Sequence, residues 1–128
     1  MPHFILEYTD NIKADADIPS LLKKVTEVLI AHGDMFPIGG IRARAIELHD
    51  YRIADGQADD AFVHATLKIG AGRSEADKQQ VGDELFEVMK AHFADLMSRR
   101  YLALSMELYE FPRPTYKHGN IHARFKKA

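Results

Sequence analysis

The sequence predicts an α+β fold in which two tandem β-α-β units form one four-stranded sheet, with two helices on one of its faces. Two observations lead to this prediction. Short segments of alternating apolar residues are separated by longer segments whose apolar residues recur at helical spacing. The order strand, helix, strand occurs twice, at about residues 2–55 and 61–110, and a tail follows at 111–128. We therefore expect a single domain over residues 1–128.

The first unit begins with a strand over Phe4–Tyr8, a segment rich in strand-forming residues. Asp17-Ile18-Pro19 is typical of a helix start, because a proline in the first turn lacks only an N–H that the helix does not use. Apolar residues follow at helical spacing, and Gly33 ends the helix. Ile41–His49 is the second predicted strand.

The second unit repeats this order. Phe62–Ile69 reads as a strand, and Ser74 is a helix cap with Asp77 three positions later, close to the capping-box pattern. An apolar stripe from Val81 to Leu96 predicts one helix. Alternation over Tyr101–Tyr109 predicts the closing strand.

Right-handed crossovers make each unit a pair of parallel strands. Both sides of Phe4–Leu6 and of Phe62–Ala65 are apolar, so we expect the sheet face opposite the helices to be apolar too. An uncovered apolar face needs a partner, which predicts an oligomer. The tail is rich in proline and glycine and predicts irregular backbone, with a short extra strand over Ile121–Phe125.

Composition excludes several classes of function. The 128 residues carry a net charge of −2, which argues against nucleic acid as a partner. The absence of cysteine excludes disulfides and thiolate chemistry. No apolar run approaches the roughly 20 residues of a membrane span, and the N-terminus lacks the pattern of a signal peptide. We expect a cytoplasmic protein without a membrane partner.

Pro2 is the candidate catalytic base. A small residue after the initiator lets methionine be removed, and Pro2 would then carry the N-terminal amine at the start of an apolar strand. A free amine with a lowered pKa is a usable general base near neutral pH. If Met1 is retained, the proline nitrogen is an amide without basicity. From its position alone, Pro2 can be either a catalytic residue or a proline without a function.

Arg42 and Arg44 are candidate ligands of a carboxylate. They lie two positions apart on a predicted strand and so point to the same face. Arginine on a sheet face is costly unless it is paired. A bound carboxylate would pair it, and so would glutamates of neighbouring strands. Those glutamates are Glu7, Glu47 and Glu107.

The turn Ile69–Ser74 lies between a strand and a helix. A dinucleotide-binding fingerprint would need a third glycine where Glu75 stands, so we do not expect a Rossmann site. The turn instead directs Arg73 and a helix N-terminus outward, as in an anion site. The alternative is that Arg73 is a solvated turn residue.

The histidines give no catalytic or metal-binding pattern. His118 and His122 have the spacing of helical metal ligands, but they lie in the irregular tail without a third ligand, so we expect no metal site. His49 and His64 fall within strands and are expected to be packed or hydrogen-bonded. No Ser-His-Asp or paired-carboxylate arrangement is evident, which leaves Pro2 as the candidate base.

Several segments, spread over most of the chain, carry a resemblance to a known family. They are Pro2-His3-Phe4-Ile5, Phe36-Pro37, Gly40-Ile41-Arg42, Ala54-Asp55-Gly56-Gln57, Ala61-Phe62-Val63-His64 and Thr66-Leu67-Lys68-Ile69-Gly70-Ala71-Gly72-Arg73-Ser74. In these segments the chain resembles the tautomerase superfamily, and within it the 5-carboxymethyl-2-hydroxymuconate isomerase family.

The resemblance implies a fold and a set of site residues. Family members use an amino-terminal proline as general base or acid, and arginines hold the substrate carboxylates and stabilise an enolate-like intermediate. Pro2 and Arg73 are the implied catalytic residues, and Arg42, Arg44 and Arg73 the implied substrate ligands. The family forms homotrimers whose apolar sheet faces turn inward. Because the second unit begins with Ala61, only the first could supply a base.

The implied activity is proton transfer in 5-carboxymethyl-2-hydroxymuconate to give the 2-oxo-alkene product, in the degradation of homoprotocatechuate (4-hydroxyphenylacetate). The partner is then a small polycarboxylate molecule, and neither a cofactor nor a metal is implied. Two alternatives stay open. One is a non-catalytic trimeric protein that binds carboxylates or acts as a scaffold, and the other is a tautomerase of simpler 2-keto acids such as phenylpyruvate.

Overall fold

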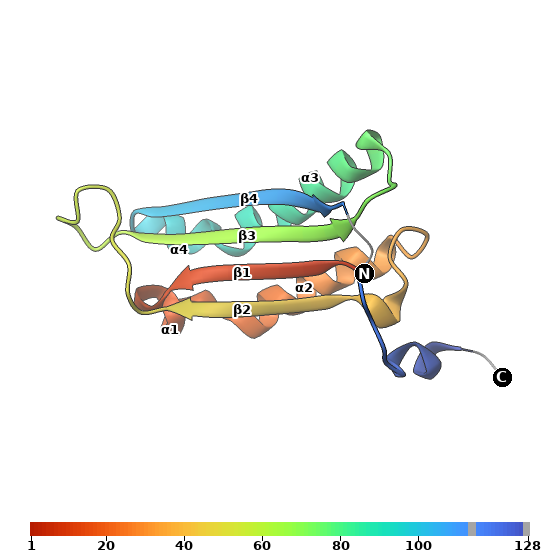
Figure 1. Cartoon of the computed structure of the whole chain (residues 1–128). Coiled ribbons are helices and arrows are strands. Elements are labelled where there is room, and N and C mark those ends of the chain that lie inside the picture. Colours follow the sequence, from red (N-terminus) through yellow and green to blue (C-terminus); the bar gives the residue numbers. More distant parts are fainter. Residues whose placement is uncertain (113–114, 127–128) are drawn as a thin grey trace.

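The protein forms a four-stranded mixed sheet with helices on one face, as the computed structural model shows for residues 1–112 and 115–126 (Figure 1). The strands are β1 (His3–Thr9), β2 (Arg42–Leu48), β3 (Ala61–Gly70) and β4 (Leu102–Phe111). Their order across the sheet is β2-β1-β3-β4. β1 and β2 are parallel, β3 and β4 are parallel, and β1 and β3 are antiparallel. The predicted pairing of each unit is confirmed.

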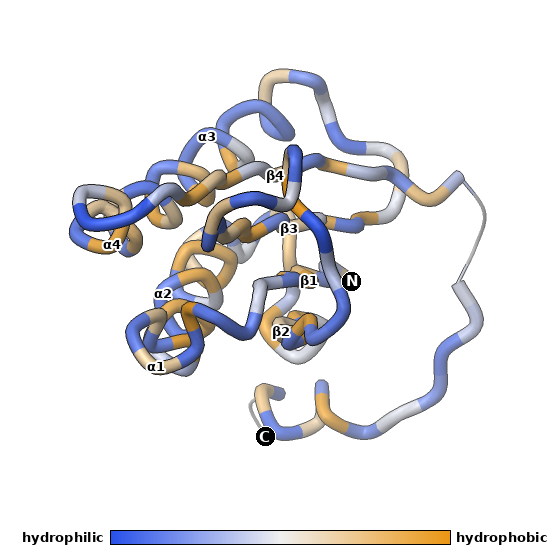
Figure 2. The backbone as a smooth tube through the Cα atoms, turned by 90° about the vertical axis from the view of Figure 1, so that its left-hand side faces the viewer, coloured by the Kyte–Doolittle hydropathy of each residue, from blue (hydrophilic) through white to orange (hydrophobic). Residues whose placement is uncertain are grey.

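Two long helices, α2 and α3, lie on the same side of the sheet (Figure 2). The helices are α1 (Lys13–Ala16), α2 (Ile18–Ala31), α3 (Glu75–His92) and α4 (Ala94–Arg99), and the 3-10 helices are η1 (Asp10–Ile12), η2 (Ile38–Gly40) and η3 (Ile121–Phe125). In the part of the chain that the structure describes, no helix is long and apolar enough to cross a membrane.

Two segments differ from the sequence prediction, and the short helices η1 and α1 between β1 and α2 are additional to it. The single helix predicted through Leu96 is interrupted at Phe93, where α3 ends and α4 begins. Ile121–Phe125 is the 3-10 helix η3 rather than a strand, because the tail leaves the sheet after β4 and packs against η2 instead of a strand edge. Residues 113–114 and 127–128 of the predicted tail lie outside the described residues.

Both predicted helix starts are confirmed. Asp17 adopts the left-handed region, with φ 46°, and its carboxylate accepts a hydrogen bond from the Ser20 N–H at 3.4 Å. The Ser74 hydroxyl accepts a hydrogen bond from the Asp77 N–H at 3.1 Å. Each cap satisfies a donor that the first helical turn leaves free. The second cap also fixes where the turn after β3 ends.

The core lies between the helices and one face of the sheet. β1 and β3 are the two central strands, and alternate residues of each are buried. The helices bury residues at helical spacing against them. The strand contribution is Phe4, Leu6, Tyr8, Ala61, Val63, Ala65, Leu67 and Ile69, and the helix contribution includes Leu21, Val25, Leu29, Val81, Leu85 and Met89.

The face away from the helices is mixed, and the expectation of an apolar face is wrong. The residues between the buried ones of each strand point to this face. Most of the apolar residues of the strands face the helices. The residues left on the opposite face are therefore a mixture of apolar, polar and charged side chains. The face carries Ile5, Ile46, Phe62 and Tyr109, together with Glu7, Arg44, His64, Lys68 and Glu107.

The topology brings four parts of the chain to one end of the sheet (Figure 1). β1 and β2 both begin there, and β3 and β4 both end there, because the two parallel pairs are joined in antiparallel fashion. Pro2, Arg42, the turn with Arg73, and the tail after Phe111 therefore meet at this end.

We predict that Ser74→Ala lowers the free energy of unfolding by about 1 kcal/mol, because the Asp77 N–H loses its acceptor. Ser74→Asp keeps an acceptor and should retain most of the stability. Urea unfolding of the three proteins measures the difference. Equal stability of Ser74→Ala and the parent chain would contradict a stabilising role of the cap.

Candidate active site

The start of the chain is held in the sheet. Pro2 is buried, and its carbonyl accepts a hydrogen bond from the Arg42 N–H at 3.0 Å, which extends the pairing of β1 with β2. Met1 is partly buried, and its Cα lies 3.6 Å from the position of a Cβ built on Gly40. The nitrogen of residue 2 is thus fixed at the end of the sheet rather than free in solvent.

Arg73 is positioned by contacts from three directions. Its Nη1 donates to the Gly70 carbonyl at 2.9 Å and its Nη2 to the Met35 carbonyl at 2.7 Å. Its guanidinium lies 5.1 Å from the ring centroid of the buried Phe36. Its Nε is buried without a hydrogen-bond partner among the described residues. A positioned guanidinium with an unused donor suits an anionic ligand, so the solvated alternative does not hold.

Arg42 lies at the first position of β2 and is partly buried. Its Nη1 donates to the carbonyls of Gly39 at 2.9 Å and Ile41 at 3.1 Å. These bonds hold one side of the guanidinium against the backbone before β2. The other donors of this planar group can meet a carboxylate.

Arg44 lies two residues further along β2, on the sheet face away from the helices (the open face), and is exposed. Its Nη1 contacts Nδ1 of His3 at 3.1 Å. Burial, and then the charge of Arg44, lower the pKa of His3, which leaves a neutral ring nitrogen to accept this bond. Arg44 is therefore engaged with a side chain of β1, outside the cluster that surrounds Pro2.

The glutamates considered as partners of Arg42 and Arg44 do not pair with these arginines. Glu47 forms ion pairs with Lys13 and His49, and Glu107 contacts His64. Among the described residues, no ion pair joins Arg42 or Arg44 to a glutamate. Pairing with glutamates thus does not account for these arginines.

Positive charge gathers around the N-terminal amine. Burial lowers the pKa of the amine, and the charges of Arg73, Lys117 and Arg42 lower it further, in that order. In the structure this amine belongs to Met1. The environment that disfavours a protonated amine here is the one that a free Pro2 amine would enter. Lys117 was not found from the sequence, where it is one cation in an irregular tail.

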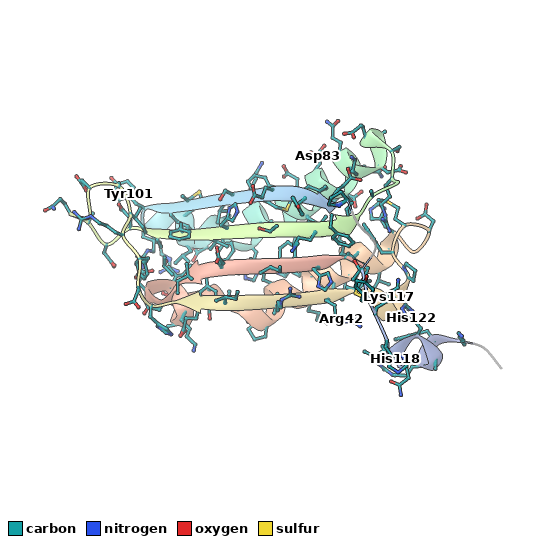
Figure 3. All side chains as sticks on the ribbon, viewed as in Figure 1. Arg42, Asp83, Tyr101, Lys117, His118 and His122 are labelled. Carbon is teal, nitrogen blue, oxygen red and sulfur yellow. The ribbon has the colours of Figure 1, made fainter. Side chains whose placement is uncertain are left out.

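Two cavities flank Met1, and both are lined by Met1 and Lys117. One, of about 340 Å³, reaches the turn after β3 and the end of β4 through Gly70 and Phe111. The other, of about 540 Å³, reaches Arg42 and the tail up to His122. Figure 3 shows Arg42, Lys117 and His122 at the same end of the sheet. The chain start, Arg42 and the tail with Lys117 therefore enclose concave space with positive charge at its edge.

A larger cavity, of about 760 Å³, lies between α3 and the edge strand β4 and is not part of this site. Its cation, Lys78, is already paired with Glu75 at 2.6 Å and Glu110 at 2.8 Å. A cavity whose lysine is neutralised in this way offers little to an anionic ligand.

The tail is anchored beside the site by η3. A Cβ built on Gly39 would lie 2.7 Å from Nδ1 and 2.9 Å from Cα of His122, so the tail backbone can lie this close only because residue 39 is glycine. Both His118 and His122 line the larger of the two cavities at Met1. Among the residues that the structure describes, no group of three or more His, Asp or Glu side chains could hold a metal ion.

The sequence model of the family described as 5-carboxymethyl-2-hydroxymuconate isomerase matches residues 2–125. The chain belongs to this family. The resemblance noted in the sequence is thereby confirmed, and with it membership of a family of isomerases.

Two similar proteins extend this result over almost the whole chain. A 5-carboxymethyl-2-hydroxymuconate Delta-isomerase of Escherichia coli is 53% identical over 127 residues, which cover 98% of this chain and 100% of that protein. The crystal structure of a 5-carboxymethyl-2-hydroxymuconate isomerase from Deinococcus radiodurans R1 superposes with a TM-score of 0.93 at 52% identity, covering 98% of this chain and 95% of that one.

A protein of much lower sequence identity has the same fold. A fused 4-OT protein, described as a symmetric trimer, has a TM-score of 0.63 at 16% identity, covering 86% of this chain and 87% of that one. At this identity the likeness shows the fold alone. The predicted tautomerase-like fold of the isomerase family is confirmed.

We predict that Gly39→Ala releases η3 from η2, because the added methyl would lie 2.9 Å from the His122 Cα. Hydrogen–deuterium exchange should then accelerate at residues 121–125. Gly40→Ala is the matched control, since its methyl would meet its nearest neighbour at an ordinary 3.6 Å. Protection of the tail that is unchanged in Gly39→Ala would contradict this packing.

Proposed function

We propose that this protein is a 5-carboxymethyl-2-hydroxymuconate Delta-isomerase acting in the degradation of homoprotocatechuate, with Pro2 as its general base. The observation that carries the proposal is the position of the chain start, which is buried at the end of the sheet among Arg42, Arg73 and Lys117. The isomerase activity named for the Escherichia coli and Deinococcus relatives supports the choice of substrate.

The chemistry follows from a neutral amine at residue 2. Burial and nearby cations keep the amine unprotonated, so it can take the proton of the 2-hydroxyl group. The electrons of that O–H bond form the carbonyl, and those of the C2–C3 double bond form a new C3–C4 double bond. The electrons of the C4–C5 double bond then take the proton back from the protonated amine and form the C5–H bond. The product is the 2-oxo-alkene, and the amine is regenerated.

The arginines stabilise the charge that moves during this transfer. Arg73 has a buried Nε without a partner among the described residues, and its fixed guanidinium can stabilise the negative charge that develops on the conjugated oxygens. Arg42 pairs with a carboxylate of the substrate. Arg44 is a more distant ligand, because its contact with His3 directs it along the open face.

Met1 has to be removed for this mechanism. With Met1 present, the nitrogen of Pro2 is an amide, and Met1 also lines both cavities at the site. Its loss would free the base and join the space on its two sides. Methionine that stays in the mature protein would favour the alternative function, a protein that binds carboxylates without turning them over.

The assembly belongs to the same proposal and is a homotrimer. Exposed apolar side chains, Ile30 and Ile38, line a groove next to the edge strand β2. Partly buried Phe86, Leu104 and Met106 line the groove at the opposite edge, β4. Two different grooves that carry apolar side chains at opposite edges suit a head-to-tail ring. The trimer described for the fused 4-OT protein of the same fold supports the number three.

We predict that Pro2→Ala lowers kcat for 5-carboxymethyl-2-hydroxymuconate while the far-UV spectrum is unchanged, because the primary amine that alanine leaves lacks the ring that fixes the proline nitrogen. The upper bound of the loss is the full contribution of a positioned general base, roughly 10²–10⁴. Intact mass first establishes that the untagged wild-type protein lacks Met1. A form with one residue left before Pro2 should be inactive. Full activity in that blocked form would exclude the amine as base. If the wild-type protein turns over phenylpyruvate better than 5-carboxymethyl-2-hydroxymuconate, the simpler 2-keto acids would be favoured as substrates.

We predict that Arg73→Gln shifts the acid limb of the kcat/KM profile to higher pH. Removing a positive charge beside the amine stabilises its protonated form and so raises its pKa. Arg73→Lys keeps the charge and should leave the limb near its wild-type position, although both variants lose turnover. The measurement is kcat/KM against pH for the three proteins. If the acid limb of Arg73→Gln stays at the wild-type pH, Arg73 does not influence the pKa of the amine.

A further inference from the structure

The proposed substrate has one carboxylate more than the arginines at the amine can pair. A muconate has a carboxylate at each end, and the carboxymethyl group adds a third. Arg42 and Arg73 are the two arginines whose charges lower the pKa of the amine. Arg44 contacts His3 and lies outside this cluster, so a trianion held by Arg42 and Arg73 keeps one charge uncompensated near the amine. A further cation at the same site would improve both affinity and selectivity.

Lys117 is in the right place for that carboxylate. It lines both cavities at Met1, and its side chain is exposed. Lysine is a compact charge on a flexible stem, so it can follow a carboxylate on a freely rotating carboxymethyl arm. Among the described residues, Lys13, Lys78 and Lys90 each form an ion pair with a glutamate, whereas Lys117 forms none.

The tail that carries Lys117 is held on both sides of it. Before Lys117, the ring of Phe111 lies 3.5 Å from a Cβ built on Gly70, at the end of β3. After Lys117, η3 packs on η2, with His122 against Gly39. Two anchors keep Lys117 over the chain start, and this limits the entropy that its ordering on a ligand would cost.

We propose that Lys117 is a specificity-determining residue, which binds the carboxymethyl carboxylate and so makes the tail part of the substrate site. The inference rests on the proposed function, since it names the part of that substrate that the tail recognises. It implies that the protein distinguishes a tricarboxylate from the otherwise similar dicarboxylate by the charge at residue 117.

The kinetic test compares two substrates in one variant. Lys117→Gln should lower kcat/KM for 5-carboxymethyl-2-hydroxymuconate by about 10- to 100-fold, the range of a lost hydrogen bond to a charged group. Measured at a pH above the acid limb of both proteins, where the amine is unprotonated with or without the charge of Lys117, the variant should keep kcat/KM for 2-hydroxymuconate, which lacks the carboxymethyl group, within about twofold. Lys117→Arg should retain most of the selectivity. Lys90→Gln removes a lysine of α3 as the matched control and should change neither value.

A binding test keeps this inference separate from the proposed function. The probes are propane-1,2,3-tricarboxylate and glutarate, a dicarboxylate of the same chain length, measured by calorimetry with wild type and Lys117→Gln. We expect wild type to prefer the tricarboxylate and the variant to lose that preference. If this holds while wild type does not isomerise 5-carboxymethyl-2-hydroxymuconate, the proposed activity fails and recognition by Lys117 stands.

The opposite outcomes overturn the inference and leave the activity intact. Equal losses for both substrates in Lys117→Gln would show that Lys117 acts on the amine and not on the third carboxylate. Unchanged kinetics in Lys117→Gln would show that the tail lies beside the site without taking part. Gly39→Ala provides a second variant, because it displaces the tail with Lys117 intact and should reduce the same selectivity.

Discussion

The antiparallel contact between β1 and β3 is the constraint on which the site depends. Each β-α-β unit on its own sends the beginnings of its two strands to one end and their carboxyl ends to the other. Joining the units through β1 and β3 puts the beginnings of the first pair beside the carboxyl ends of the second. The chain start, the β2 arginine, the turn after β3 and the tail can meet only because of this pairing.

The charge at that end suits both requirements of the proposed function. A base needs an unprotonated amine, and a polyanionic ligand needs cations. Positive groups around the amine meet both requirements, since they disfavour its protonated form and attract carboxylates. The arrangement is strained electrostatically while the site is empty, because like charges lie near one another. A ligand with several carboxylates relieves that repulsion on binding, which adds to its selectivity over monoanions.

Much of the fold could be predicted from the sequence because its signals are local. The start of α2 at Asp17 and that of α3 at Ser74 depend on side chains that cap the next turn, and the alternation in β4 is visible without its neighbours. The break at Phe93 was missed because α3 and α4 bury their apolar residues on the same side, so the stripe continues across it.

The site was predicted in part, for a related reason. Pro2, Arg42 and Arg73 stand in motifs that a family resemblance can identify, whereas Arg44 turned out to contact His3 on the open face. Lys117 had no local signal, since its candidate role arises from its position at the same cavity as Met1, more than a hundred residues away in the chain. The error at η3 is of the same kind, because its conformation is set by η2.

The closeness of residues 1 and 117 also imposes an order of events during biosynthesis. At about 5–20 residues per second, the tail leaves the ribosome roughly 6–23 s after the chain start has been made. During that interval Met1 is accessible to an aminopeptidase, whereas in the finished chain it lies partly buried beneath the tail. Removal of Met1, which the proposed function requires, would therefore have to take place before the other end of the same chain covers it.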